Sequence, residues 1–120
     1  ESDVVSLHVD GRAENANLIG AAEFAAMKPG ALLINTARGG LIDEAALLQA
    51  LRLGQLGGAA LDVLSQEPPP ADHLLLRSDL PNLIVTPHMA WASAEARQRM
   101  VVQLKQNIEA FISGKELNRV

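Results

Sequence analysis

The chain has 120 residues, 48% of them hydrophobic and 20% charged, a composition that suits one folded domain and excludes a disordered tail. Its net charge is −4 and it has no basic run, so we expect no nucleic-acid partner. Without cysteine it has no disulfide framework or thiolate metal site, and no apolar run approaches the ~20 residues that cross a bilayer, so we expect no membrane partner.

The first part of the chain predicts a strand, a loop and a helix. Residues 4–9 form a β-branched run typical of a strand, and the polar residues 10–17 predict a loop. Strong helix formers over residues 21–27 predict a helix, which Lys-Pro-Gly at 28–30 ends. Because Glu1 stands first and the strand pattern begins almost at once, we expect a piece of a longer chain.

The middle of the chain predicts strand, helix and strand. Residues 31–35 are apolar and predict the second strand. Asp43 can cap a helix over residues 44–53, whose leucines share one face, with Gly54 just past its end. The small, apolar residues 58–62 predict the third strand.

The last third predicts a loop, a strand and a long helix. Residues 65–82 contain four prolines and predict an ordered loop with one helical turn over 73–76. Residues 83–86 predict the fourth strand, and Ser93 can cap a helix that Gly114 closes. The apolar stripe of this helix comprises Val101, Leu104, Ile108 and Phe111, widened by Met100 and Ile112. The stripe predicts packing in a core or against another domain.

Strands that alternate with helices predict the α/β class, with parallel pairing and right-handed crossovers, as in half of a doubly wound sheet. Three of the four strands end in polar residues, at Asn35-Thr36, at Asp62 and at Thr86. Because the carboxyl ends of parallel strands meet at one edge, where ligands bind such sheets, these residues predict a site there.

Arg38 follows the second strand and stands before Gly39 and Gly40. A guanidinium group can hold a carboxylate with two parallel hydrogen bonds. The glycines would let the backbone approach a ligand closely or take a positive φ. The alternative is a surface arginine in a strand-to-helix turn.

His88 follows a proline at the end of the fourth strand, where its imidazole could transfer a proton near neutral pH. A carboxylate such as Glu67 beside it would fix its tautomer, and Asp62 could accept a hydrogen bond from an amide. The alternatives are a structural histidine, a solvated loop glutamate and an aspartate that caps a loop. We expect no metal site, because His8 and His73 do not share ligand spacing with His88.

Four segments in one order carry a resemblance to a known family. They are MKPG at residues 27–30, NTARGGLIDE at 35–44, LDVLSQEP at 61–68 and TPHMAWAS at 86–93. Together they resemble the D-isomer-specific 2-hydroxyacid dehydrogenases over nearly the whole chain. The last segment, with its Trp91, is most similar to the glycerate dehydrogenase and hydroxypyruvate reductase branch.

The resemblance implies a catalytic set of Arg38, Glu67 and His88. By the family's pattern, Arg38 holds the carboxylate and carbonyl of a 2-keto acid. His88 donates a proton to the carbonyl oxygen as hydride arrives from a nicotinamide, and Glu67 keeps that imidazole protonated and oriented.

The resemblance also implies NAD or NADP as cofactor, in a Rossmann-type NAD(P)-binding domain. The positions that match cofactor-contacting residues are Thr36, Ala37, Arg38, Asp62 and His88. Of these, Thr36 and Ala37 would line the nicotinamide ribose and ring, and Asp62 would contact the nicotinamide amide.

Two departures from the family pattern limit the resemblance. Residues 10–12 read Asp-Gly-Arg where the family has a Pro-Leu-Thr type of turn, and the chain lacks the upstream G-x-G-x-x-G and acidic residue. We therefore expect residues 1–92 to be the C-terminal half of the NAD(P)-binding domain. Residues 93–120 would be a long C-terminal helix and tail, and the N-terminal half of the enzyme would be absent.

The function implied is NAD(P)-dependent reduction of a small 2-keto acid, of the hydroxypyruvate or glyoxylate type, to the D-2-hydroxy acid. We expect the full-length enzyme to be cytoplasmic and homodimeric, and the 120-residue piece to be inactive. The alternatives are an NAD-sensing, dehydrogenase-like binding module of the corepressor type and an inactive fragment.

Overall fold

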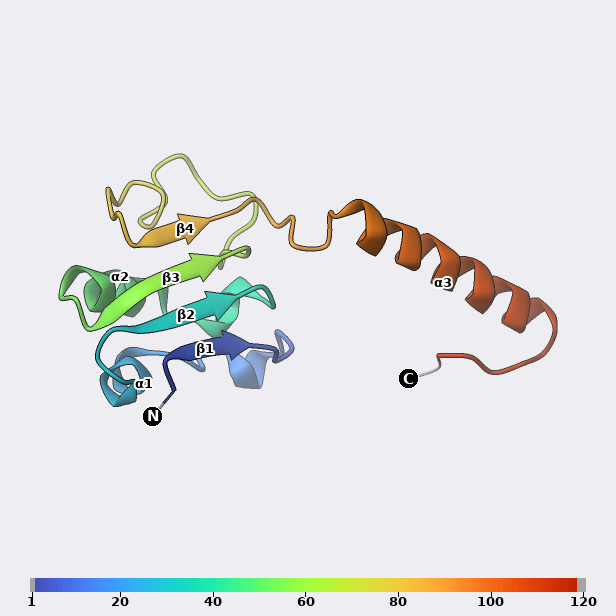
Figure 1. The fold of residues 1–120 in the computed structure, drawn as a ribbon, viewed down its shortest axis with the longest axis horizontal. Helices are drawn as coiled ribbons and strands as arrows, with labels where there is room; N and C mark the ends of the chain where they lie inside the picture. Colours follow the sequence, from blue (N-terminus) through green and yellow to red (C-terminus); the bar gives the residue numbers. More distant parts are fainter. Residues whose placement is uncertain (1, 119–120) are drawn as a thin grey trace. The chain divides into compact units, whose positions relative to one another are not determined.

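The computed structural model describes residues 2–118, and the chain divides into two compact units, Glu1–His88 and Met89–Val120 (Figure 1). The first unit contains a four-stranded sheet with its helices, and the second contains one long helix.

The sheet consists of β1 (Val4–Leu7), β2 (Ala31–Asn35), β3 (Leu56–Leu61) and β4 (Leu83–Val85), in that spatial order. All three neighbouring pairs are parallel, which confirms the predicted α/β class. β1 and β4 form the two edges (Figure 1).

β3 begins two residues before the predicted start, at Leu56, and so includes Gly57. A Cβ on Gly57 would lie 2.4 Å from the carbonyl oxygen of Gly30, so the strand approaches the preceding turn too closely for any side chain there. Gly57 lies at a shift in the register of β2 and β3, because Ala31 pairs with Leu56 and Leu32 with Gly58.

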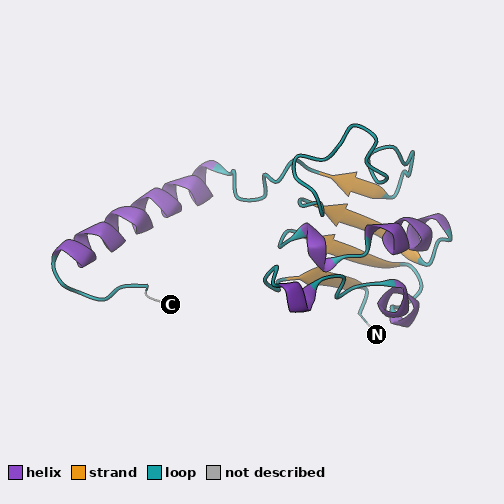
Figure 2. Cartoon of the chain, turned by 180° about the vertical axis from the view of Figure 1, so that it is seen from behind, coloured by secondary structure: helices purple, strands orange, loops and turns teal. Residues whose placement is uncertain are grey.

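The helices α1 (Ala21–Ala26) and α2 (Glu44–Arg52) cover the same face of the sheet (Figure 2). Two short 3₁₀ helices, Ala13–Asn15 and Gly39–Leu41, lie in the loops after β1 and β2. The core between sheet and helices is almost wholly aliphatic. Its most deeply buried large side chains are Phe24, Leu33, Leu41, Leu47 and Leu56.

The segment between β3 and β4 contains no helix. The one helical turn predicted over residues 73–76 is present as a single hydrogen-bonded turn, in which the Arg77 amide donates to the carbonyl of His73 at 3.0 Å. This long loop therefore depends on side-chain contacts for its position, a point that bears on the site below.

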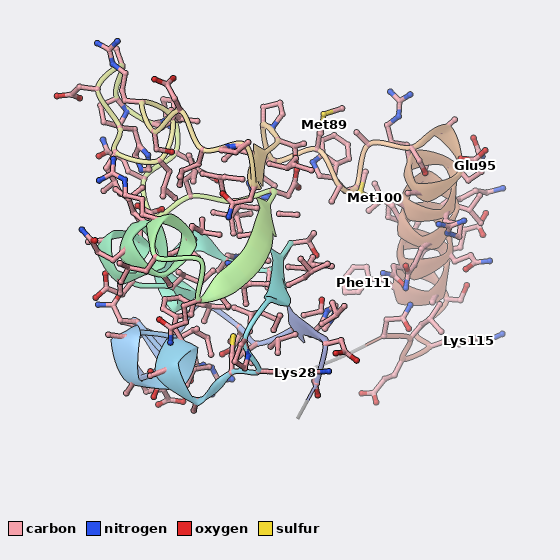
Figure 3. The ribbon with its side chains drawn as sticks, turned by 60° about the vertical axis from the view of Figure 1, so that its left-hand side comes forward. Lys28, Met89, Glu95, Met100, Phe111 and Lys115 are labelled. Carbon is pink, nitrogen blue, oxygen red and sulfur yellow. The ribbon has the colours of Figure 1, made fainter. Side chains whose placement is uncertain are left out.

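In the second unit, α3 (Ala94–Ile112) has the predicted boundaries, because Ser93 accepts a hydrogen bond from the Ala96 amide and Gly114 follows with a φ of +66°. Met100 and Phe111 project from the same side of the helix, opposite Glu95 (Figure 3). None of the residues of α3 is buried. What its apolar stripe packs on, a core or another domain, stays a prediction. Among the described residues, no helix combines the length and the hydropathy that a membrane span requires.

Candidate active site

The carboxyl ends of three strands meet at one edge of the sheet, which we call the rim. The Asp62 amide donates to the carbonyl of Asn35 at 2.9 Å, and the Thr86 hydroxyl donates to the Asp62 carboxylate. The polar residues that end β2, β3 and β4 are thus joined by hydrogen bonds across the sheet. At the end of β2, Thr36 is exposed and Ala37 is half-buried, whereas Asp62 is buried.

The turn after β2 is organised by Asn35, whose side chain is fully buried. Its Oδ1 accepts from the Ala37 amide at 3.0 Å, and its Nδ2 donates to the Arg38 carbonyl at 2.8 Å. These two bonds fix the backbone that carries Arg38. From the sequence, Asn35 was predicted only to be a polar strand end, although an amide side chain that bonds the backbone two residues on is a common turn-forming device.

The Arg38 side chain is exposed and donates to the carbonyl of Ala37 at 2.6 Å. It takes part in no ion pair with the residues that the structure describes (2–118). A Cβ on Gly11 would lie 2.9 Å from its Cγ, so the loop after β1 packs against the arginine stem. The guanidinium is accordingly placed by backbone on both sides and remains accessible to an anionic ligand.

Neither of the two glycines after Arg38 has the positive φ that was one of the predictions for them. A Cβ on Gly39 would lie 1.9 Å from the carbonyl carbon of Leu64, so Gly39 is required by close contact with the loop after β3. A Cβ on Gly40 would meet no atom within 4 Å.

Glu67 and His88 form a hydrogen-bonded ion pair, with 2.7 Å between Glu67 Oε2 and His88 Nδ1. The other carboxylate oxygen of Glu67 accepts from the Leu64 amide at 3.0 Å. The hydrogen bond from His88 lowers the pKa of Glu67, and the bond from Leu64 lowers it further. The carboxylate is therefore ionised at neutral pH, which places a proton on His88 Nδ1.

The backbone of His88 has a φ of +52°, in the left-handed region that non-glycine residues rarely occupy. Strain of this kind persists only where the surroundings hold it, and it is concentrated at functional sites. Here it accompanies the turn that brings the imidazole to Glu67.

Glu67 borders two hollows. One, of about 450 Å³, is also lined by Arg12, Arg38 and Val63. The other, of about 340 Å³ and mostly apolar, is also lined by Thr86 and His88. The arginine and the histidine of the predicted set thus lie on different hollows that share one carboxylate.

The rim residues suit the nicotinamide end of a dinucleotide. A buried carboxylate at the end of β3, already oriented by Thr86, has the chemistry to accept from a carboxamide N–H. Among residues 2–118, no three histidine or acidic side chains gather as a metal site would require.

One cluster at the site was not predicted from the sequence. Glu44, at the start of α2, is buried and accepts from both the amide and the hydroxyl of Ser65, each at 2.8 Å. Its Oε2 also lies 3.1 Å from Nε2 of the buried His73. The spacing of these residues along the chain carries no signal, and Glu44 had the pattern of an ordinary acidic residue in the first turn of a helix.

The parallel sheet and its polar rim define a Rossmann-like α/β domain, the class that binds nucleotide cofactors at the carboxyl ends of its strands. The chain belongs to the D-isomer specific 2-hydroxyacid dehydrogenase family, whose NAD binding domain model matches residues 1–90.

Individual relatives agree with this assignment. A glycerate dehydrogenase from Methylorubrum extorquens is 58% identical over 120 residues, which are all of this chain and 38% of the relative. An acyclic imino acid reductase solved with NADPH and D-Arg superposes with a TM-score of 0.87 at 38% identity, over 99% of this chain and 37% of that one. A D-lactate dehydrogenase with NAD+ from Lactobacillus jensenii gives 0.86 at 35% identity, over 100% of this chain and 39% of that one. The chain thus spans less than two fifths of the length of these relatives.

Proposed function

We propose that this chain supplies the proton-transfer and carboxylate-binding side chains of an NAD(P)-dependent reductase. Its substrate would be a small 2-keto acid of the hydroxypyruvate or glyoxylate type, reduced to the D-2-hydroxy acid by the longer protein. The observation that carries the proposal is the 2.7 Å contact between Glu67 and His88 at the rim that also holds Arg38.

Each side chain has a role that follows from its chemistry. Arg38 binds the substrate carboxylate through its forked donors and orients the neighbouring carbonyl. His88 gives a proton to the carbonyl oxygen while the carbonyl carbon receives hydride. Glu67 holds Nδ1 of that imidazole, so that Nε2 is the atom facing the substrate.

NAD or NADP, when bound, supplies the hydride. Thr36 and Ala37 would line the nicotinamide ribose and ring, and Asp62 would accept from the nicotinamide amide, with Arg38 and His88 on the same rim. The imino acid reductase was solved with NADPH and the D-lactate dehydrogenase with NAD+, so proteins that bind either cofactor superpose on this chain.

We further propose that residues 1–92 form the C-terminal half of the NAD(P)-binding domain, with residues 93–120 as a long helix and tail. The N-terminal half of the enzyme would complete the cofactor site, because the glycine-rich phosphate-binding turn is not in this sequence. A homodimer in the cytoplasm is the expected state of the complete enzyme.

The test uses the complete enzyme with hydroxypyruvate, glyoxylate and pyruvate, each with NADH and with NADPH. Oxidation of the cofactor should accompany formation of the D-isomer of the 2-hydroxy acid wherever the product is chiral. His88→Gln should abolish most of this activity, whereas Arg52→Gln, a change at an exposed residue in the last turn of α2, should leave it intact. Formation of the L-isomer, or full activity in His88→Gln, would contradict the proposal.

A further inference from the structure

The loop that carries Glu67 is held by Glu44, a residue of another element. Glu44 Oε1 accepts from the Ser65 amide, and Oε2 accepts from the Ser65 hydroxyl and from His73. One buried carboxylate thus pins both ends of the segment 65–73. Glu67 lies inside this segment, two residues after Ser65.

The contacts continue from Ser65 to the ion pair. Leu64 precedes Ser65, and its amide donates to Glu67 at 3.0 Å. The backbone of Leu64 and Ser65 also lies against Gly39, which is next to Arg38. This contact leaves the loop little room to shift toward β2. Any displacement of Ser65 would therefore move the Leu64 amide away from the carboxylate that faces His88.

We propose that Glu44 is a positioning residue for the Glu67–His88 pair. It acts by holding Ser65 and His73, and through them the backbone from which Glu67 reaches the imidazole. The effect on catalysis rests on the proposed function, whereas the effect on Glu67 itself does not.

The donor pattern explains why a carboxylate is needed. His73 Nδ1 accepts from the Leu75 amide at 3.4 Å, so its Nε2 carries the proton and donates to Glu44. Three donors therefore converge on Glu44: the amide and hydroxyl of Ser65 and the imidazole N–H of His73. A glutamine has one acceptor oxygen, and its NH₂ would face a donor of the cluster.

The first test compares Glu44→Gln with Glu23→Gln in the complete enzyme. Glu23 is the matched control, because it also lies in the first turn of a helix and accepts a backbone N–H, that of Gly20 at 2.9 Å, but is exposed. We expect kcat for keto-acid reduction to fall about 10-fold or more in Glu44→Gln, because small misplacements of catalytic groups are costly. KM should change less than about threefold, since Asn35 and not Glu44 holds the turn of Arg38. Glu23→Gln should match the wild type.

A second readout does not depend on activity. The carboxyl carbon of Glu67 is titrated by carbon-13 NMR, with Glu67→Gln used to assign its signal. In Glu44→Gln the titration should move to higher pH, because the Leu64 amide no longer donates to the carboxylate. If the wild type reduces no keto acid, the proposed function fails, but this titration still tests the inference. A folded Glu44→Gln variant with unchanged kcat and an unchanged Glu67 titration would overturn it.

A double variant tests whether Glu44→Gln acts through mismatched hydrogen bonds or through the lost charge of the carboxylate. In Glu44→Gln with His73→Leu, the glutamine oxygen can accept from the Ser65 amide and its NH₂ can donate to the Ser65 hydroxyl, with no opposing imidazole. We expect kcat to recover most of its loss, and a folded double variant that stays as slow as the single one would overturn the mechanism. If Glu44→Gln does not fold, Ser65→Ala takes its place, since it removes only the hydroxyl bond. A smaller fall in kcat then supports the inference, and unchanged kcat with an unchanged titration overturns it.

Discussion

At the scale of single residues, the site depends on side chains whose donors and acceptors are assigned by their neighbours. Asn35 uses its amide to fix the turn of Arg38, and Leu64 and His88 bind the two oxygens of Glu67. Arg38 itself has no carboxylate partner among the described residues, so we expect its contribution to appear when substrate binds.

Replacing Arg38 by alanine tests this role. A charge-assisted, bidentate contact to a carboxylate should be lost, so kcat/KM on the best keto acid should fall by at least about 100-fold. Steady-state kinetics of the complete enzyme measure it, with Arg52→Ala in the last turn of α2 as the control. A loss below about tenfold would show that Arg38 does not bind the carboxylate.

The Glu67–His88 pair makes stability depend on pH in a defined direction. The pKa of Glu67 is lowered in the folded protein from an ordinary value of 4.5, mainly by the hydrogen bond from His88. The ionised Glu67 therefore contributes fully to the free energy of unfolding above pH 4.5, and this contribution is lost as the pH falls through the lowered pKa. Glu67→Gln should be less stable than the wild type at pH near 7, and the difference should shrink below about pH 4.5. The unfolding midpoints of both proteins, measured across this pH range, test the prediction. A difference between them that stayed constant with pH would contradict it.

At the scale of elements, the loops after β2 and β3 act as one structure. Gly39 contacts the backbone of Leu64, and Glu44 binds Ser65 from the start of α2. The element that carries Arg38 and the loop that carries Glu67 are thereby fixed to each other, although neither loop contains an α-helix.

Gly39→Ala and Gly40→Ala form a matched pair that tests this contact. At Gly39 a Cβ would lie 1.9 Å from a backbone atom, which no side-chain rotation relieves, so we expect destabilisation of at least about 3 kcal/mol. At Gly40 a Cβ meets nothing within 4 Å, and the change should stay within about 0.5 kcal/mol. Denaturant unfolding of both variants measures the difference, and equal effects would refute the contact.

At the scale of the whole molecule, one face of the sheet in the first unit carries no helix (Figure 2). Val4 is 48% exposed there, Leu32 45% and Ile84 63%. The parallel register places Val4 beside Leu32, which makes the exposed apolar side chains continuous across strands. Burial of such a surface is favourable by about 25 cal/mol per Å², and β1 and β4 add unpaired strand edges.

We therefore predict that a chain of these 120 residues alone self-associates and binds NAD poorly. Light scattering and NAD titration measure both properties. Leu32→Lys with Ile84→Lys should reduce the association, whereas Leu53→Lys, at an exposed leucine that follows α2, should not. A stable monomer at high concentration with micromolar NAD affinity would contradict the prediction.

The secondary-structure elements and the fold class could be predicted from the sequence alone. A continuous apolar run predicted β2 at Ala31–Asn35, and the capping residues Asp43 and Ser93 predicted the starts of α2 and α3. These features were predictable because each depends on residues that are close together along the chain. The named motifs carried the family assignment for the same reason, since their order and spacing can be read without a structure.

The contacts that hold the site together could not be predicted from the sequence. Glu67 meets His88, and Glu44 meets Ser65, across 21 residues of chain in each case, and Gly39 is required by a loop that follows a different strand. The type of a residue does not reveal such contacts. A buried glutamate and a solvated one are identical in the sequence, and glycine is used both in turns and where two backbones pass closely. The packing of α2 against the sheet brings these residues to their partners. It gathers side chains from separate segments of the sequence into one site.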